Sequence, residues 1–133
     1  MKKIELPIKG KELIYRVNPE KIIALGLNYS EHVRESVFLN TKDLSKDIPI
    51  EPVLFPKTPN VLIKSGESIV IPSFLRVDYD FDELRVDYEA ELAFIIKDKC
   101  KNVPVSEALD HVFGYTCMND VSMRNLQVND KSG

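Results

Sequence analysis

The apolar residues of this sequence fall in short runs that are separated by proline, glycine and asparagine. Runs of this kind are typical of short strands joined by turns. The strongest is Val86–Ile96, where apolar residues alternate over a length that is long for a strand, and brief helical patterns cover Ser30–Ser36 and Ser106–Val112. The pattern predicts a β-rich α+β fold. The other segments expected to form strands are Leu13–Val17, Ile22–Leu25, Val53–Phe55, Ser68–Ile71 and Phe113–Met118, with a loop or lid at 37–52.

Length, charge and cysteine content narrow the class of protein. The 133 residues make one domain or part of one. The 18 basic and 21 acidic side chains give a formal net charge of -3, which argues against a nucleic-acid-binding protein because such proteins need a basic surface. No apolar stretch approaches the roughly 20 residues that span a bilayer, and the N-terminus lacks the apolar core of a signal peptide. Cys100 and Cys117 form no disulfide framework, so we expect a cytoplasmic protein without membrane or nucleic-acid partners.

Two carboxylates share one face of the strongest predicted strand. Because side chains alternate along a strand, Glu89 and Glu91 project from the same side, about 6.6 Å apart along the strand. Ala93 and Ile95 continue that face, so two like charges stand beside apolar neighbours. A divalent cation that prefers oxygen ligands, such as Mg²⁺, Mn²⁺ or Ca²⁺, would offset their repulsion. The same spacing is also typical of the solvent-exposed start of an edge strand.

An acidic run before this strand partly follows the pattern of a calcium-binding EF-hand loop. Asp78, Asp80, Asp82 and Glu89 stand at positions 1, 3, 5 and 12 of that pattern. Glu83 occupies the position where the sharp turn needs glycine, and the flanking segments are strand-like where an EF-hand has helices. A solvated acidic loop is the better interpretation of this run.

A third carboxylate, Asp120, ends a predicted strand directly before the segment Val121–Gln127. Aspartate at a strand-to-helix junction is often a helix N-cap, but the same position can direct a carboxylate to a metal held by a neighbouring strand. If the segment is helical, Arg124 and Gln127 are three residues apart and share one helix face.

His32 and Glu35 stand three residues apart in a segment predicted to be helical. The carboxylate of Glu35 can then orient the imidazole of His32 and raise its basicity, which makes the pair a candidate base for activating water. The same spacing is common for a solvent-exposed pair of side chains on a helix.

Taken in this order, the motifs resemble the catalytic domain of the fumarylacetoacetate hydrolase family. The resemblance covers Lys21–Lys131, which is most of the chain. Each motif is weak alone, and the specificity lies in four motifs with consistent order and spacing. The motifs are Ile22–Tyr29 with His32 and Glu35, Pro52–Lys57, Val86–Ala93, and Gly114–Thr116 followed by Asn119, Asp120, Arg124 and Gln127.

The resemblance implies a fold and a set of site residues. The fold would be a mixed β-roll of the fumarylacetoacetase C-terminal-domain type, which is usually dimeric, so we expect a homodimer or a higher oligomer. Glu89, Glu91 and Asp120 would bind Mg²⁺ or Mn²⁺, with Ca²⁺ as an alternative. His32 with Glu35 would form the catalytic base of a lid helix.

The resemblance also implies a class of reaction. Arg124 and Gln127 match positions near the reacting oxygen of the substrate. Members of the family cleave, decarboxylate or isomerise small 2-oxo and 1,3-diketo acids, which implies a divalent-metal-dependent hydrolase, lyase or isomerase. The expected substrates are small 2-oxo acids of the acylpyruvate, oxaloacetate or 2-hydroxyhepta-2,4-diene-1,7-dioate type.

The sequence departs from the family pattern in several places. Asn125 and Met123 stand where aspartate and alanine are usual, and a lysine that family members carry beyond the Gln127 region has no equivalent. We therefore expect residues 1–20 to form an N-terminal strand segment and residues 21–133 to form part of the catalytic domain, with an incomplete roll. The alternative is a non-catalytic metal-binding half-domain that pairs with itself or with another chain.

Overall fold

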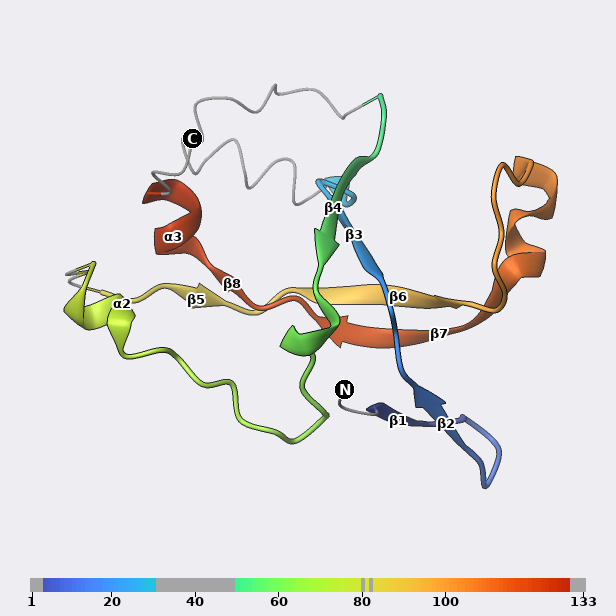
Figure 1. Cartoon of the computed structure of the whole chain (residues 1–133), viewed down its shortest axis with the longest axis horizontal. Coiled ribbons are helices and arrows are strands. Elements are labelled where there is room, and N and C mark those ends of the chain that lie inside the picture. Colours follow the sequence, from blue (N-terminus) through green and yellow to red (C-terminus); the bar gives the residue numbers. More distant parts are fainter. Residues whose placement is uncertain (1–3, 31–49, 80, 82, 130–133) are drawn as a thin grey trace. The chain divides into compact units, whose positions relative to one another are not determined.

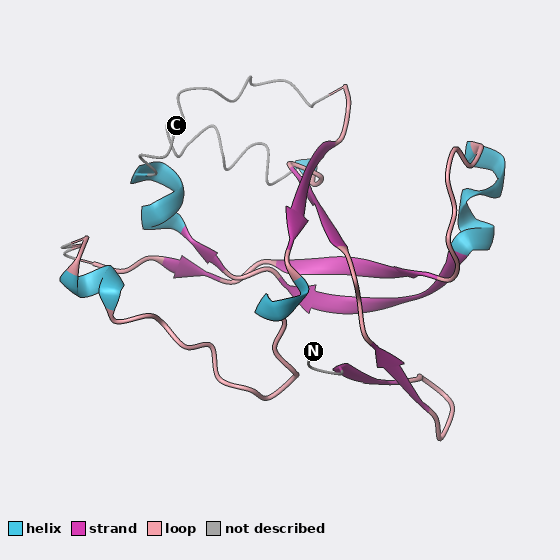
Figure 2. Ribbon diagram, in the orientation of Figure 1, coloured by secondary structure: helices cyan, strands magenta, loops and turns pink. Residues whose placement is uncertain are grey.

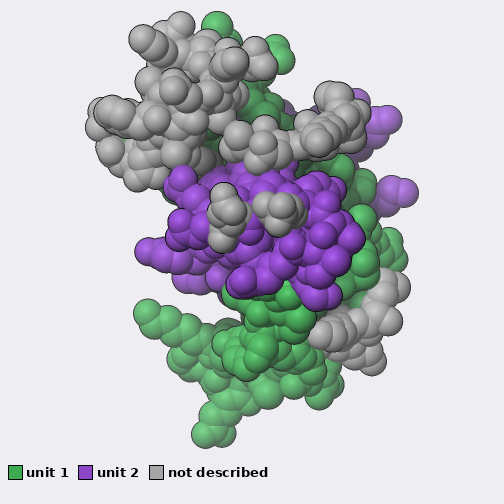
Figure 3. All heavy atoms as spheres, turned by 90° about the vertical axis from the view of Figure 1, so that its left-hand side faces the viewer, with its two compact units in different colours: residues 1–71 green, residues 72–133 purple. Residues whose placement is uncertain are grey.

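The computed structural model describes residues 4–30, 50–79, 81 and 83–129. Strands predominate among these residues, with a few short helices (Figure 1 and Figure 2). This agrees with the β-rich α+β fold class that the sequence predicts. The chain divides into two compact units, residues 1–71 and residues 72–133, which Figure 3 colours separately. Among the described helices, none has the length and apolar character needed to cross a bilayer.

The described residues of the first unit form two antiparallel strand pairs and one 3₁₀ helix. Its elements are β1 (Ile4–Pro7), β2 (Ile14–Val17), β3 (Ile22–Gly26), β4 (Val53–Lys57) and η1 (Pro59–Val61). β1 pairs with β2, and β3 pairs with β4. The loop from β1 to β2 passes through Gly10, whose φ of 76° lies in the left-handed region that glycine adopts without steric cost.

The sequence-based expectations for this unit are mostly confirmed. The strands predicted at Leu13–Val17, Ile22–Leu25 and Val53–Phe55 correspond to β2, β3 and β4, with bounds that differ by at most two residues. The strand predicted at Ser68–Ile71 is wrong, because that segment pairs with no strand among the described residues. Its side chains are exposed, up to 80% for Val70, so the apolar run has neither a ladder nor a core to order it. The predicted helix at 30–36 and the loop at 37–52 fall largely outside the described residues.

The second unit contains most of the residues singled out by the sequence. Its elements are α2 (Phe74–Val77), β5 (Val86–Asp87), β6 (Ala90–Ile96), η2 (Val105–His111), β7 (Val112–Asn119), β8 (Ser122–Met123) and α3 (Arg124–Asn129). β6 pairs with β7 and β5 pairs with β8, both antiparallel. The helix and strand predicted at 106–112 and 113–118 are confirmed as η2, a 3₁₀ helix, and β7.

The two strand pairs of the second unit belong to one antiparallel ribbon (Figure 1). Residues of β5 and β6 keep the same offset to their partners on β8 and β7, up to a bulge between Ile95 and Ile96. Between the two pairs, the amide of Asp120 donates a hydrogen bond of 2.8 Å to the carbonyl of Glu89. The register is therefore continuous, and Glu89 lies opposite Asp120.

The ribbon is interrupted where a side chain replaces a backbone acceptor. The backbone N–H of Glu89 donates to Oδ1 of Asn119 at 2.9 Å. In a regular antiparallel ladder this N–H would bond to the backbone of the residue opposite, Asp120. The single strand predicted over Val86–Ile96 is therefore divided into β5 and β6, with Tyr88 and Glu89 between them. The alternation of burial along β6 still follows the two faces that the sequence predicts.

Candidate metal centre

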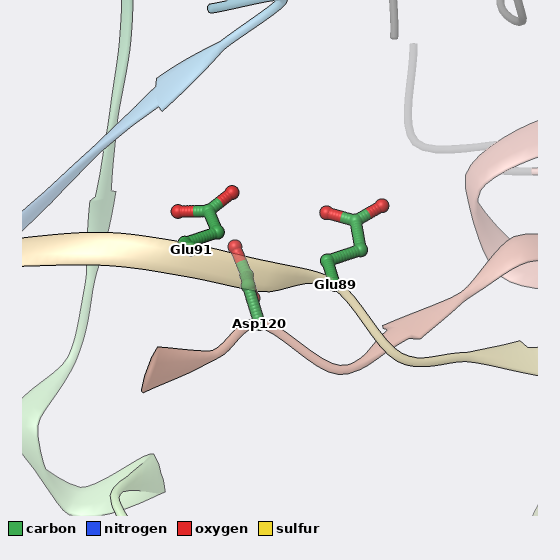
Figure 4. Close-up of side chains that lie close together, drawn as sticks. All are labelled: Glu89, Glu91 and Asp120. Atoms are coloured by element: carbon green, nitrogen blue, oxygen red, sulfur yellow. The ribbon is translucent and has the colours of Figure 1, made fainter. Parts of the chain in front are cut away.

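Three carboxylates come together on one face of the ribbon in the second unit. Glu89 immediately precedes β6, Glu91 lies within it, and Asp120 immediately follows β7. Residues two apart on a strand share a face, and so do residues opposite each other in an antiparallel pair. The register therefore brings all three side chains to the same side, as Figure 4 shows. One carboxylate oxygen from each of the three residues lies within 4.8 Å of the oxygens from the other two.

The surroundings of the three carboxylates are partly shielded from water. Asp120 is only 6% exposed and is the one buried charged residue among those described, while Glu89 and Glu91 are half-buried. Like charges this close and this far from solvent repel each other unless a cation offsets them. Three carboxylates are ligands suited to Mg²⁺, Mn²⁺ or Ca²⁺, so the donor set fits a hard divalent cation.

The structure bears on the alternatives that the sequence leaves open. The side chains of Glu89 and Glu91 are half-buried and not fully exposed to solvent. Asp120 is not the N-cap of a helix over Val121–Gln127, because β8 intervenes and α3 begins only at Arg124. The short β8 forms because the ribbon register continues past Asp120, so the chain stays extended for three more residues.

Arg124 lies beside the carboxylate cluster and uses three different nitrogens to contact three side chains, of which Glu89 belongs to the cluster. Its Nε donates to Oδ2 of Asp87 at 2.9 Å, and its Nη1 donates to Oε1 of Gln127 at 2.9 Å. Its Nη2 forms an ion pair with Oε1 of Glu89. The side chain is 17% exposed. The predicted common face of Arg124 and Gln127 is confirmed by their direct hydrogen bond.

Charge complementarity stabilises this arrangement. The hydrogen bond from Arg124 lowers the pKa of Asp87 below its usual range against the opposing effect of burial, and the charge of Arg85 adds to the lowering. Burial by itself lowers the pKa of Arg124, but the hydrogen bond to Asp87 and the charge of Glu89 outweigh it, so the pKa is raised overall. Both groups therefore stay ionised at neutral pH, and Arg124 brings a permanent positive charge to the cluster.

Sequence reasoning missed Asp87, which lies within the strand predicted at Val86–Ile96 but was not recognised as a candidate site residue. The signal was the alternation itself: Asp87 precedes Glu89 by two residues and so belongs to the same face. The backbone register supports this placement, because the amide of Arg124 donates 2.9 Å to the carbonyl of Arg85, two residues further back. Arg85, Asp87, Glu89 and Glu91 thus form one row along the ribbon.

Asn125, a departure from the family pattern, has a structural role in the second unit. Its Oδ1 accepts a hydrogen bond of 2.7 Å from the backbone N–H of Arg85, and its Nδ2 donates one of 2.9 Å to the carbonyl of Glu83. An aspartate could accept the first bond but could not donate the second. Asparagine therefore ties α3 to the segment before β5, next to Arg124.

The predicted base pair of His32 and Glu35 lies outside the described residues. Its role as a water-activating dyad stays a prediction.

Comparison with known proteins identifies the family to which this carboxylate cluster belongs. A family model described as the fumarylacetoacetate (FAA) hydrolase C-terminal domain matches residues 21–133. The chain belongs to the fumarylacetoacetate hydrolase family. This confirms the resemblance that the motifs indicate, and members of this family are generally dependent on divalent metals.

Relatives and solved structures agree with this assignment. An uncharacterized protein of Archaeoglobus fulgidus is 40% identical over 126 residues, covering 95% of this chain and 44% of that protein. The mitochondrial oxaloacetate tautomerase of Xenopus laevis is 39% identical over 111 residues, covering 84% of this chain and 30% of that protein. Fumarylacetoacetate hydrolase from psychrophilic Exiguobacterium antarcticum matches with a TM-score of 0.55 and 29% identity, covering 87% of this chain and 40% of that one. The chain thus spans less than half the length of each of these proteins.

Proposed function

We propose that Glu89, Glu91 and Asp120 bind Mg²⁺ or Mn²⁺ and that the chain takes part in a metal-dependent reaction on a small 2-oxo acid. The observation that carries the proposal is the convergence of three shielded carboxylates on one face of the ribbon. When bound, the ion supplies a Lewis acid that stabilises negative charge on the oxygens of such a substrate. Membership of the fumarylacetoacetate hydrolase family supports both the metal and the substrate class.

Arg124 and Gln127 complete the proposed site. The planar guanidinium of Arg124 lies beside the carboxylates, and its fork of N–H donors suits a carboxylate or an enolate oxygen. Oε1 of Gln127 accepts a hydrogen bond from Arg124, which orients the amide and leaves its NH₂ group as a donor toward the substrate. Both residues would stabilise charge that develops during the reaction.

Oxaloacetate tautomerisation is the reaction to test first, because the relative from Xenopus laevis is named an oxaloacetate tautomerase. In this reaction a proton leaves C3 and another joins the C2 oxygen, so negative charge develops on that oxygen in between. The same oxygen becomes an enolate when oxaloacetate loses carbon dioxide or an acylpyruvate is cleaved. In all three cases the residues of the site would hold the 2-oxo acid group and stabilise that charge. His32, oriented by Glu35, would accept the proton or activate the water.

Metal binding is the direct test of the proposal. Isothermal titration with Mn²⁺ should show one site in the wild-type chain, and Glu91→Gln should weaken it by at least about tenfold because one charged ligand is lost. Glu107→Gln removes an acidic side chain from η2 and serves as the matched control, which should bind Mn²⁺ like the wild type. Equal affinities of wild type and Glu91→Gln would contradict the site.

Activity is the second test. The decay of the enol form of oxaloacetate can be followed by ultraviolet absorbance with Mg²⁺, with Mn²⁺ and with EDTA. Any acceleration should depend on the metal and disappear in Glu91→Gln. A rate that EDTA leaves unchanged would contradict metal dependence, whatever the titration gives.

A further inference from the structure

Asp87 lies beside the candidate metal centre without being one of its three carboxylates. It stands two residues before Glu89 on the same face of the ribbon, and its Oδ2 accepts a hydrogen bond of 2.9 Å from Nε of Arg124. We infer that Asp87 is a positioning residue, which holds the guanidinium of Arg124 at the edge of the carboxylate cluster. The inference rests on the proposed function, in which this guanidinium faces the substrate.

The contacts of Arg124 fix both the place and the plane of its guanidinium. Each of its three nitrogens has its own acceptor: Asp87 for Nε, Gln127 for Nη1 and Glu89 for Nη2. An arginine has five N–H groups, so these three contacts leave two for a further acceptor. Asp87 is itself held in β5 by its pairing with Ser122 on β8. The ribbon backbone therefore determines where Arg124 stands.

Removing Asp87 would change what Arg124 does to the cluster. Arginine prefers two parallel hydrogen bonds to one carboxylate, and Glu89 is already in contact with Nη2. Without its partner at Nε, the guanidinium can turn and take both oxygens of Glu89. A divalent cation needs at least one of them. Asp87 thus keeps Glu89 accessible to the metal while leaving Arg124 close enough to contact a substrate.

A different role for Asp87 would be purely electrostatic, since its negative charge alone attracts a cation. The two roles make different predictions. If the charge alone matters, Asp87→Ala and Asp87→Asn should weaken metal binding equally, and they should do so whether or not Arg124 is present. If positioning matters, Asn should retain part of the function, because its Oδ1 can still accept the hydrogen bond from Nε.

The experiment is a double-mutant cycle with Mn²⁺ affinity, measured by titration calorimetry, as its readout. We expect Asp87→Ala to weaken Mn²⁺ binding about tenfold, as is typical for residues that orient a metal site from outside. Asp87→Asn should lose clearly less. In the Arg124→Gln background, Asp87→Ala should change the affinity by less than about twofold, because the residue through which it acts is gone.

The chain offers a matched control for this cycle. The sequence Arg76-Val77-Asp78-Tyr79 repeats as Arg85-Val86-Asp87-Tyr88, and Asp78 is an exposed residue at the end of α2. Asp78→Ala should leave Mn²⁺ binding unchanged. Thermal melts of all variants identify any loss of fold, and Asp87→Glu, which keeps charge and acceptor, should restore most of the affinity that Asp87→Ala loses.

The outcomes separate this inference from the proposed function. If the wild type binds Mn²⁺ and Glu91→Gln does not, but Asp87→Ala binds like the wild type, the metal site holds and the role of Asp87 is overturned. An equal loss in both Arg124 backgrounds, or in Ala, Asn and Glu alike, also overturns positioning. A wild type that does not bind Mn²⁺ overturns the metal site and this inference with it.

Discussion

Arg124 is the residue whose chemical shape matters most in the candidate site. Its three nitrogens contact three acceptors that come from β5, from the residue before β6 and from α3. Lysine carries the same charge on a single ammonium group and cannot reproduce this fork. Replacing Arg124 by lysine therefore keeps the charge but removes the geometry, so this substitution shows which of the two the site requires.

We predict that Arg124→Lys weakens the binding of oxalate to the Mn²⁺-loaded protein about tenfold, which corresponds to the loss of one charged hydrogen bond. Oxalate is a small dianion that resembles the enolate of a 2-oxo acid. Titration calorimetry gives the affinity, and Arg76→Lys, an exposed arginine in the same sequence context, is the control. Identical oxalate affinities for Arg124→Lys and the wild type would mean that charge alone matters.

His32 provides a second prediction at this scale. Only hydrolysis needs an activated water, so His32→Ala should slow the cleavage of acylpyruvates more than the decarboxylation of oxaloacetate, by roughly 10²–10⁴ if the residue is a general base. Rates of both reactions with Mg²⁺ present give the comparison. His111→Ala changes the other histidine, which lies in η2 with its Nδ1 2.8 Å from Asp98 Oδ1, and is the control. Equal losses in both reactions would rule out a water-activating role for His32.

The sequence predicts the individual carboxylates of the candidate site because local rules place them. Alternation puts Glu89 and Glu91 on one face, and Asp120 is recognised as the end of a strand. The contacts of Asp87 and Asn125 are not accessible in this way. Each of them depends on a residue more than 30 positions away along the chain, and only the register of the ribbon brings such residues together.

At the scale of elements, local sequence patterns again predict the strands of the ribbon but not the contacts between residues that are distant along the chain. The run Val86–Ile96 predicts an extended segment and both of its faces, which the structure confirms. Its division into β5 and β6 follows from the side chain of Asn119 on another strand, so no local pattern could reveal it. Conversely, Ser68–Ile71 has the composition of a strand but lacks a partner among the described residues, and strands need partners to satisfy their backbone groups.

The turn from β6 into η2 contains a pH-dependent contact between Asp98 and His111. Nδ1 of His111 lies 2.8 Å from Oδ1 of Asp98, and the amide of Lys97 donates 2.9 Å to the carbonyl of His111. The hydrogen bond from His111 lowers the pKa of Asp98. A lowered folded-state pKa means that the contact stabilises the fold above the unfolded pKa of aspartate, about 3.9, and that this stabilisation is lost as the pH falls through the folded value.

We therefore predict that Asp98→Asn has a slightly lower Tm than the wild type between about pH 5 and pH 7, by less than roughly 4 °C because the pair is exposed. The difference should close as the pH falls below about 4. Thermal melts monitored by circular dichroism over this range test it. Asp110→Asn, an exposed residue of η2, should show no such pH dependence. A difference between wild type and Asp98→Asn that persists to pH 2 would contradict the linkage.

At the scale of the whole molecule, the second unit exposes an apolar surface. The face of the β6–β7 pair opposite the carboxylates carries Phe94, 51% exposed, directly across from Tyr115, 60% exposed. Among the described residues these strands form a two-stranded sheet, so each has an edge that bonds to no further strand. Exposed apolar faces and open strand edges both favour association. The further apolar residues of this face are Leu92, Ile96 and Phe113.

We accordingly predict that the chain forms a homodimer or a higher oligomer through the apolar face around Phe94 and Tyr115. Light scattering at micromolar concentration should give at least twice the mass of one chain. The double change Phe94→Ser and Tyr115→Ser should shift the protein toward the monomer, because each aromatic side chain contributes a large area of apolar surface. Ile50→Ser removes a fully exposed apolar residue of the first unit and should leave the mass unchanged. A wild-type mass equal to one chain, together with a cooperative thermal melt, would show that this face needs no second copy.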